Sequence, residues 1–175
     1  MSKPYKISIR DLLTAEDSST FQIQPIPIVQ RERFAQILTE ILENDGWEKD
    51  LEGRPTFSPE KGKLYTFEPD NLQFSVKLEA TEKIEEEIEG WNPRELREEA
   101  ERELSRRQRE LEKKLSLQLE AEKEERHRLF ESLIARATGK ALKELAQSIG
   151  NIESIEESFS ENGEYRLVIT IEENE

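Results

Sequence analysis

The stretch that organises the chain is NPRELREEAERELSRRQRELEKKLSLQLEAEKEERHRLFESLIAR, residues 92–136. After Pro93 it contains neither Gly nor Pro, and the next glycine along the chain is Gly139. Asn92 is a favourable N-cap, Pro93 suits the first helical position, and Glu95 stands where a capping-box acid reaches back to the cap amide. We therefore expect one continuous helix of about 45 residues, roughly 68 Å long at 1.5 Å per residue.

The middle of this predicted helix is polar. Between Ser105 and Arg128 its apolar residues are Leu111, Leu115, Leu117, Leu119 and Ala121. Apolar positions repeat better at eleven residues than at seven, so a long autonomous coiled coil is poorly supported. Three interpretations stay open: the helix is a solvated spacer, it pairs with its own copy or another chain's helix, or it folds along its own body. We favour pairing.

The residues before the long helix predict short strands around one amphipathic helix. Alternation predicts strands at 5–9 and 21–24, with a turn at 16–20 between them. Apolar residues at helical spacing predict a helix closed at Gly46 and followed by an anchoring Trp47; they are Phe34, Ile37, Leu38, Ile41 and Leu42. Gly53, Pro55, Pro59 and Gly62 mark residues 50–62 as a loop.

Two further strands, 63–67 and 72–80, flank the turn signal Glu-Pro-Asp-Asn at 68–71. The alternation of apolar and polar residues continues as far as Ile88. Because Ile84 and Ile88 also suit a helix, the pattern leaves 81–90 open between strand and helix.

Beyond the long helix we expect Gly139 to kink or cap it, and a second short helix with an apolar face to end at Ile149. Residues 152–159 and 165–171 flank Glu-Asn-Gly at 161–163, which predicts a hairpin. The fold class is therefore α+β: a small antiparallel sheet of hairpins packed by two short amphipathic helices, with the long charged helix inserted between the halves. The expected parts are 1–91, 92–138 and 139–175, the last completing the same body as the first.

Composition narrows the classes of function. The chain has 175 residues and a net charge of −14, and the segment 92–137 is neutral, so the rest of the chain carries the whole excess. An acidic body repels nucleic acid and anionic membranes, so DNA and membranes are not expected partners. There is no Cys, no signal-peptide pattern and no apolar run of membrane-spanning length, so we expect a cytoplasmic protein.

No pattern of catalytic residues emerges. His127 is the only histidine, it lies among charged residues of the long helix, and we expect it to be solvated. The Gly-rich phosphate-binding motifs are missing. A nuclease-like metal site would need a carboxylate where Ser75 stands after Asp70. We expect no enzyme and predict no catalytic, cofactor-binding or metal-binding residues, although a carboxylate-based, metal-dependent activity stays open in so Glu-rich a chain.

The favoured function is a non-catalytic protein-interaction or assembly module that binds a protein, either its own copy or a larger complex. The predicted partner-binding residues are Arg102, Leu104, Arg106, Arg109, Leu111, Lys113, Leu115 and Leu119. One alternative is an RNA-associated protein that uses the basic cluster 102–114, which lacks aromatic residues for base stacking. Another is an accessory or adaptor subunit of an ATPase or chaperone-like complex.

Overall fold

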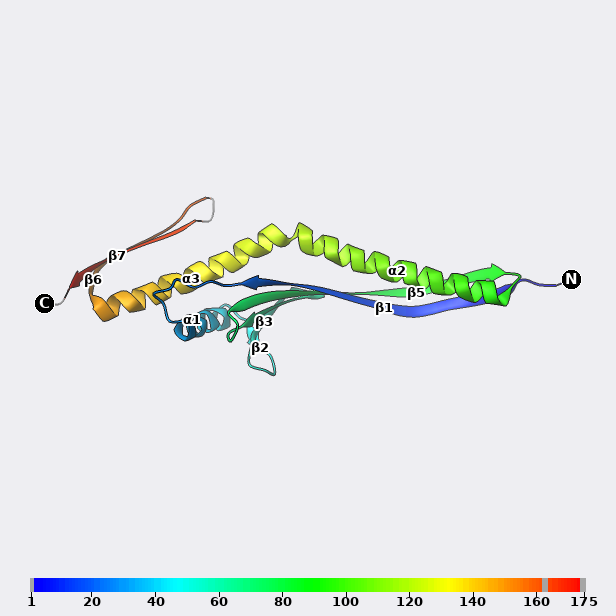
Figure 1. The fold of residues 1–175 in the computed structure, drawn as a ribbon, viewed down its shortest axis with the longest axis horizontal. Coiled ribbons are helices and arrows are strands. Elements are labelled where there is room, and N and C mark those ends of the chain that lie inside the picture. Colours follow the sequence, from blue (N-terminus) through cyan, green and yellow to red (C-terminus); the bar gives the residue numbers. More distant parts are fainter. Residues whose placement is uncertain (1, 162–163, 174–175) are drawn as a thin grey trace. The chain divides into compact units, whose positions relative to one another are not determined.

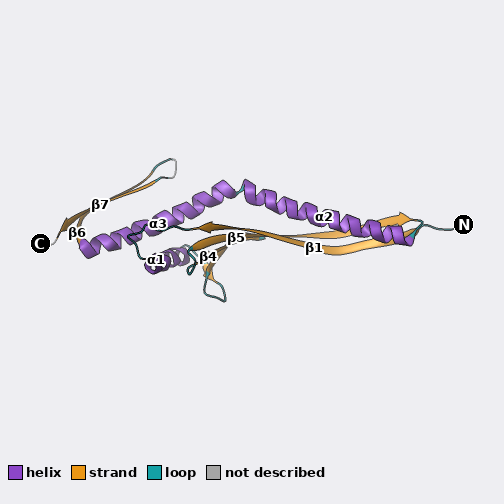
Figure 2. Cartoon of the chain, viewed as in Figure 1, coloured by secondary structure: helices purple, strands orange, loops and turns teal. Residues whose placement is uncertain are grey.

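The computed structural model describes the chain except residues 1, 162–163 and 174–175 (Figure 1). The predicted α+β class is confirmed (Figure 2). The elements are β1 (Tyr5–Gln22), α1 (Arg31–Asn44), β2 (Glu48–Lys49), β3 (Pro55–Glu60), β4 (Lys63–Glu68), β5 (Gln73–Gly90), α2 (Pro93–Ala121), α3 (Lys123–Ile149), β6 (Gly150–Phe159) and β7 (Tyr165–Glu173).

The described strands form two sheets. One has five strands in the order β1-β5-β4-β3-β2, and the other is the antiparallel pair β6-β7. The predicted pairing of 152–159 with 165–171 is confirmed by the register Ile155↔Ile169 and Phe159↔Tyr165. The tip of that predicted hairpin, Asn162-Gly163, lies outside the described residues.

Three predictions at strand level need correction or completion. The predicted turn at 16–20 is wrong, because β1 continues through it with alternating half-buried and exposed side chains. The predicted loop 50–62 contains β3, whose Pro59 lies beyond Pro55 and Thr56, the two residues that pair with β2. Residues 81–90, left open by the sequence, belong to strand β5, with Ile84 buried.

The long helix is also different from the prediction. It is interrupted at Glu122, where α2 of 29 residues ends and α3 of 27 residues begins (Figure 2). The predicted start is confirmed, since the Asn92 side chain accepts hydrogen bonds from the N–H groups of Arg94 and Glu95. Gly139 does not cap the helix, because α3 continues through it, and the predicted second short helix is the C-terminal part of α3.

The chain divides into two compact units. The first contains Met1–Ser19, Glu60–Lys63 and Lys77–Glu122, and the second contains Thr20–Pro59, Leu64–Val76 and Lys123–Glu175. Strands β1 and β5 each contribute residues to both units. The interruption at Glu122 coincides with the boundary, so α2 serves the core of one unit and α3 the core of the other.

In the second unit α1 packs against α3. A cluster of aromatic rings joins α3 to β4 and β5. Phe74 and Phe130 stack with parallel rings 4.4 Å apart, and Tyr65 meets Phe130 edge-on. Trp47 is buried as predicted, and its backbone N–H donates to the Leu42 carbonyl at the end of α1. His127 is half-buried against the ring of Phe21, so the expectation of a fully solvated histidine is wrong.

Candidate protein-interaction surfaces

Helix α2 buries one face within the first unit. Leu111, Leu115 and Leu119 follow one another at intervals of one turn and are 3–7% exposed. Polar contacts tie the same unit together: the Gln108 side chain donates to the Thr14 carbonyl, and Ser116 donates to Asp17. The helix therefore folds along strands of its own body, which is the interpretation that the sequence left as one of three.

The opposite face of α2 carries a line of exposed cations. Arg102, Arg106, Arg109 and Lys113 recur at intervals of four, three and four residues, so they share one side of the helix. All of them are exposed, and we call this set the basic stripe. Leu117, four residues further on, is an exposed apolar side chain that continues the same line.

Neighbouring glutamates hold part of the basic stripe in place. Arg106 forms ion pairs with Glu103 at 2.5 Å and Glu110 at 2.6 Å. Hydrogen bonding to Glu103 raises the pKa of Arg106, and the reciprocal bond from Arg106 lowers the pKa of Glu103. Arg102 and Arg109 form no ion pair with any residue in the described part of the chain, so their charges are available to an external carboxylate.

The eight residues predicted to bind a partner thus fall on two faces. The leucines 111, 115 and 119 face the interior of their own unit, Leu104 is half-buried, and the four cations face solvent. Burial within the unit accounts for the apolar face of α2 without a second helix. Binding of a partner protein by these leucines stays a prediction. Spacing shows which residues share a face but not what covers it, so the sequence could not reveal that the leucine face is buried within its own unit.

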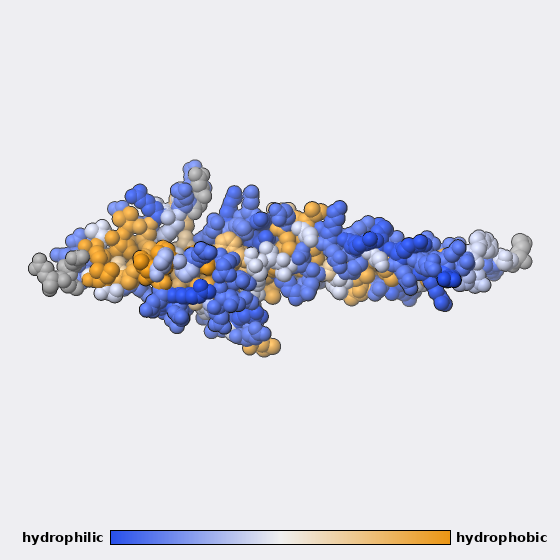
Figure 3. Space-filling view, in the orientation of Figure 1, coloured by the Kyte–Doolittle hydropathy of each residue, from blue (hydrophilic) through white to orange (hydrophobic). Residues whose placement is uncertain are grey.

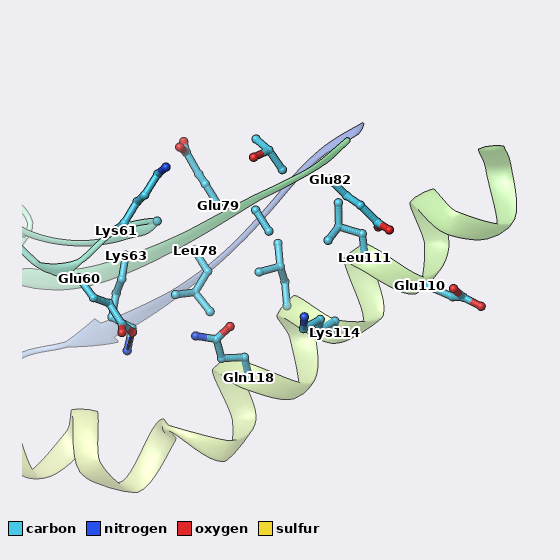
Figure 4. Close-up of a pocket in the computed structure, with 14 residues that line it drawn as sticks. Glu60, Lys61, Lys63, Leu78, Glu79, Glu82, Glu110, Leu111, Lys114 and Gln118 are labelled. Atoms are coloured by element: carbon cyan, nitrogen blue, oxygen red, sulfur yellow. Dashed lines mark ion pairs between the residues drawn. The ribbon is translucent and has the colours of Figure 1, made fainter. Parts of the chain in front are cut away.

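A cleft of about 520 Å³ lies in the first unit between β5, the turn before β4 and α2 (Figure 4). Leu78 and Gln118 point toward one another inside it, while Glu110 points away from the strand (Figure 4). Lys63, with a side chain 11% exposed, pairs with Glu60 and with Glu122. Lys63 is the most buried charge of the cleft, and carboxylates of the same unit already neutralise it. The cleft therefore resembles a packing seam more than a substrate site.

An apolar groove lies in the second unit between the C-terminal part of α3 and β7. It has a volume of about 250 Å³ and is lined by Leu142, Leu145, Ala146, Ile149, Leu167, Ile169 and Ile171. Hydrophobic side chains gather over this end of α3 (Figure 3). We call it the α3–β7 groove; no local sequence pattern singles it out, because its two walls are separated in the chain.

Among the residues that the structure describes, no three His, Asp or Glu side chains converge as a metal site would require. None of the described helices has the length and apolar character needed to cross a membrane.

Comparison with known protein families places the chain. A family model described as FtsH ternary system domain X5 matches residues 1–172, which is nearly the whole chain. No curated protein and no solved structure matches the chain significantly. The chain is therefore a member of the FtsH ternary system domain X5 family.

Proposed function

We propose that the chain is a non-catalytic adaptor that binds another protein of the FtsH ternary system through the basic stripe of α2. The family description names a system with several components, which supports an accessory role in a protein complex. The stripe supports the mode of binding: it presents four exposed cations on a helix whose opposite face is anchored in its own core.

The single observation that carries this proposal is the orientation of α2. A helix held by buried leucines presents its outer side chains on a rigid support, which lowers the entropy cost of recognition. Arg102 and Arg109 keep no carboxylate partner among the described residues, although acids outnumber bases in the chain by 40 to 26. We infer that the matching surface on the partner is acidic, because complementary charge steers association and selects the partner.

The experiment is capture from the native cell, with the tagged full-length chain as bait and FtsH as the protein sought. The double variant Arg102→Glu/Arg109→Glu should lower the amount of FtsH-containing complex captured by about tenfold, since it replaces attraction by repulsion at two positions. The matched control is Lys61→Glu/Lys83→Glu. It changes the net charge equally at exposed positions of the same unit that lie off the stripe.

Three results would count against the proposal. The first is a capture without FtsH system proteins. The second is an equal loss of the complex by both double variants, and the third is no loss by either. Salt-sensitive binding of generic RNA that depends on Arg102 and Arg109 would instead support the RNA-associated alternative.

A further inference from the structure

The β6–β7 ribbon has two edges of different character. Within the described chain β7 pairs only with β6, so its other edge keeps unpaired backbone N–H and C=O groups. The centre of β7, Leu167–Ile171, contains no charge, no Pro and no Gly, and is rich in β-branched residues. A strand edge of this kind is a template for pairing with another strand.

The β6 edge is protected by comparison. Its register with β7 shifts between Ile152 and Ser154, the signature of a bulge that disrupts regular pairing. It also carries Glu153, Glu156 and Glu157, and Glu157 is engaged at 2.5 Å by Lys143 of α3. The contrast between a charged, bulged edge and a smooth apolar edge on one ribbon singles out β7 as the pairing edge.

The two faces of β7 also differ. Tyr165, Leu167, Ile169 and Ile171 alternate as half-buried residues on the side of α3, and the last three of them line the α3–β7 groove. On the other face Arg166, Val168, Thr170 and Glu172 are exposed. An incoming strand would therefore need apolar side chains over the groove and charges matching Arg166 and Glu172 on the outer face.

The sequence of β7 meets these requirements itself. In an antiparallel pairing of two copies centred on Ile169, Arg166 lies opposite Glu172 of the second copy, and the two-fold axis repeats this ion pair. In the same register Leu167 lies opposite Ile171 and Ile169 opposite its own equivalent. Centring the pairing on Val168 would instead bring Glu164 opposite Glu172, and like charges in direct opposition are unfavourable.

We propose that β7 is a homodimerisation edge, at which two copies of this chain pair antiparallel about Ile169. The ribbons join into one four-stranded sheet, and the leucine and isoleucine rows of the two grooves become continuous over the pair of α3 helices. This inference does not rest on the adaptor function, because it concerns a different unit of the chain from the basic stripe.

The mass of the full chain in solution tests the proposal, measured by sedimentation equilibrium over a wide concentration range. We expect a reversible species of twice the 20.5 kDa chain mass. Arg166→Glu should raise the dimer dissociation constant by about tenfold, because it turns two attractive cross-strand pairs into repulsive ones. Glu172→Arg should do the same, and the double variant Arg166→Glu/Glu172→Arg should restore the dimer. This rescue separates a pairing defect from a folding defect.

The register is tested with a single cysteine. The chain has no Cys, so Ile169→Cys introduces the only thiol, and the proposed pairing places it opposite its equivalent. Mild oxidation should yield a covalent dimer from Ile169→Cys. The matched control is Ile155→Cys on the cross-strand neighbour in β6, which should stay monomeric on a denaturing gel.

Several outcomes would overturn the proposal. They are a monomer at every concentration, a dimer that neither charge reversal weakens, single reversals that the double variant fails to rescue, and equal cross-linking of the two cysteine variants. A monomer whose Arg166→Glu variant loses a cellular protein partner would also overturn it, since the edge would then serve a foreign strand.

Discussion

Gly62 shows how one residue secures the first unit. It adopts φ +82°, and a Cβ at this position would lie 2.6 Å from the Glu79 carbonyl oxygen. The Gly62 carbonyl meanwhile accepts a hydrogen bond from the Glu79 N–H at 2.8 Å. The turn is therefore closed against β5 at a distance that no side chain tolerates.

Gly62→Ala should lower the free energy of unfolding by about 2 kcal/mol or more, because it adds a backbone collision to the strain of a positive φ. Gly53→Ala is the control: Gly53 has φ +81°, but a Cβ there would meet no atom within 4 Å, so the substitution should cost only about 1 kcal/mol. Denaturant titration of the two variants measures the difference. Equal losses would show that the contact with Glu79 is absent.

Glu144 offers a test based on pH. It accepts two hydrogen bonds from Arg33 of α1, at 2.9 and 2.6 Å, and these bonds lower its pKa below the ordinary 4.5. A carboxyl group with a depressed folded-state pKa contributes stability above its unfolded pKa and loses that contribution as the pH falls through the folded value. Glu144 should therefore stabilise the α1–α3 contact at neutral pH and not in strong acid.

Glu144→Gln should lower the Tm at neutral pH, and the gap to the parent chain should close as the pH falls below about 4.5. The control is Glu131→Gln, an exposed carboxylate of the same helix with no ion pair in the described part of the chain. Its gap should be small at every pH. A Glu144→Gln gap that stays constant into acid would contradict the ion pair with Arg33.

At the scale of elements, the burial of one face of α2 predicts how its leucines respond to truncation. Leu115→Ala should lower the free energy of unfolding by about 2–5 kcal/mol, because it opens a cavity at a side chain only 3% exposed. Leu117→Ala, two residues away and 61% exposed, should change it by less than about 0.5 kcal/mol. Chemical denaturation separates the cases. Two small changes would mean that α2 is a free arm awaiting a partner helix.

Gly139 is a second position where elements meet. A Cβ there would collide with the hydroxyl of Tyr165, the first residue of β7. The absent side chain lets the hairpin approach α3, and burial together with a hydrogen bond to Glu157 raises the pKa of Tyr165 to about 12. Gly139 therefore serves packing between α3 and β7 and is not a helix terminator.

For the molecule as a whole, charge distribution predicts the salt dependence of partner binding. If the basic stripe meets an acidic surface, affinity for the captured partner should fall as salt rises, because screening shortens the reach of exposed charges to about 10 Å at 0.1 M. The variant Arg102→Glu/Arg109→Glu should bind more weakly and respond less to salt. Titration of the purified partner at several salt concentrations measures both effects, and a salt-independent affinity would argue for apolar recognition instead.

The local features of this protein follow from short-range patterns in its sequence. The Asn92-Pro93 start of α2, the apolar face of α1 with its end just before Gly46, the α+β class and the pairing of β6 with β7 all follow from capping, periodicity and turn chemistry. These signals act between residues close in the chain, so they can be interpreted without knowledge of the fold.

What covers each face depends on the packing of the whole fold. Leu111, Leu115 and Leu119 could have met another chain, but they pack within their own unit. Residues 81–90 became strand, and the long helix divided at Glu122, which ends the first unit. The physical reason is that burial is set by contacts between segments distant in sequence, and those contacts outweigh the small differences in local propensity.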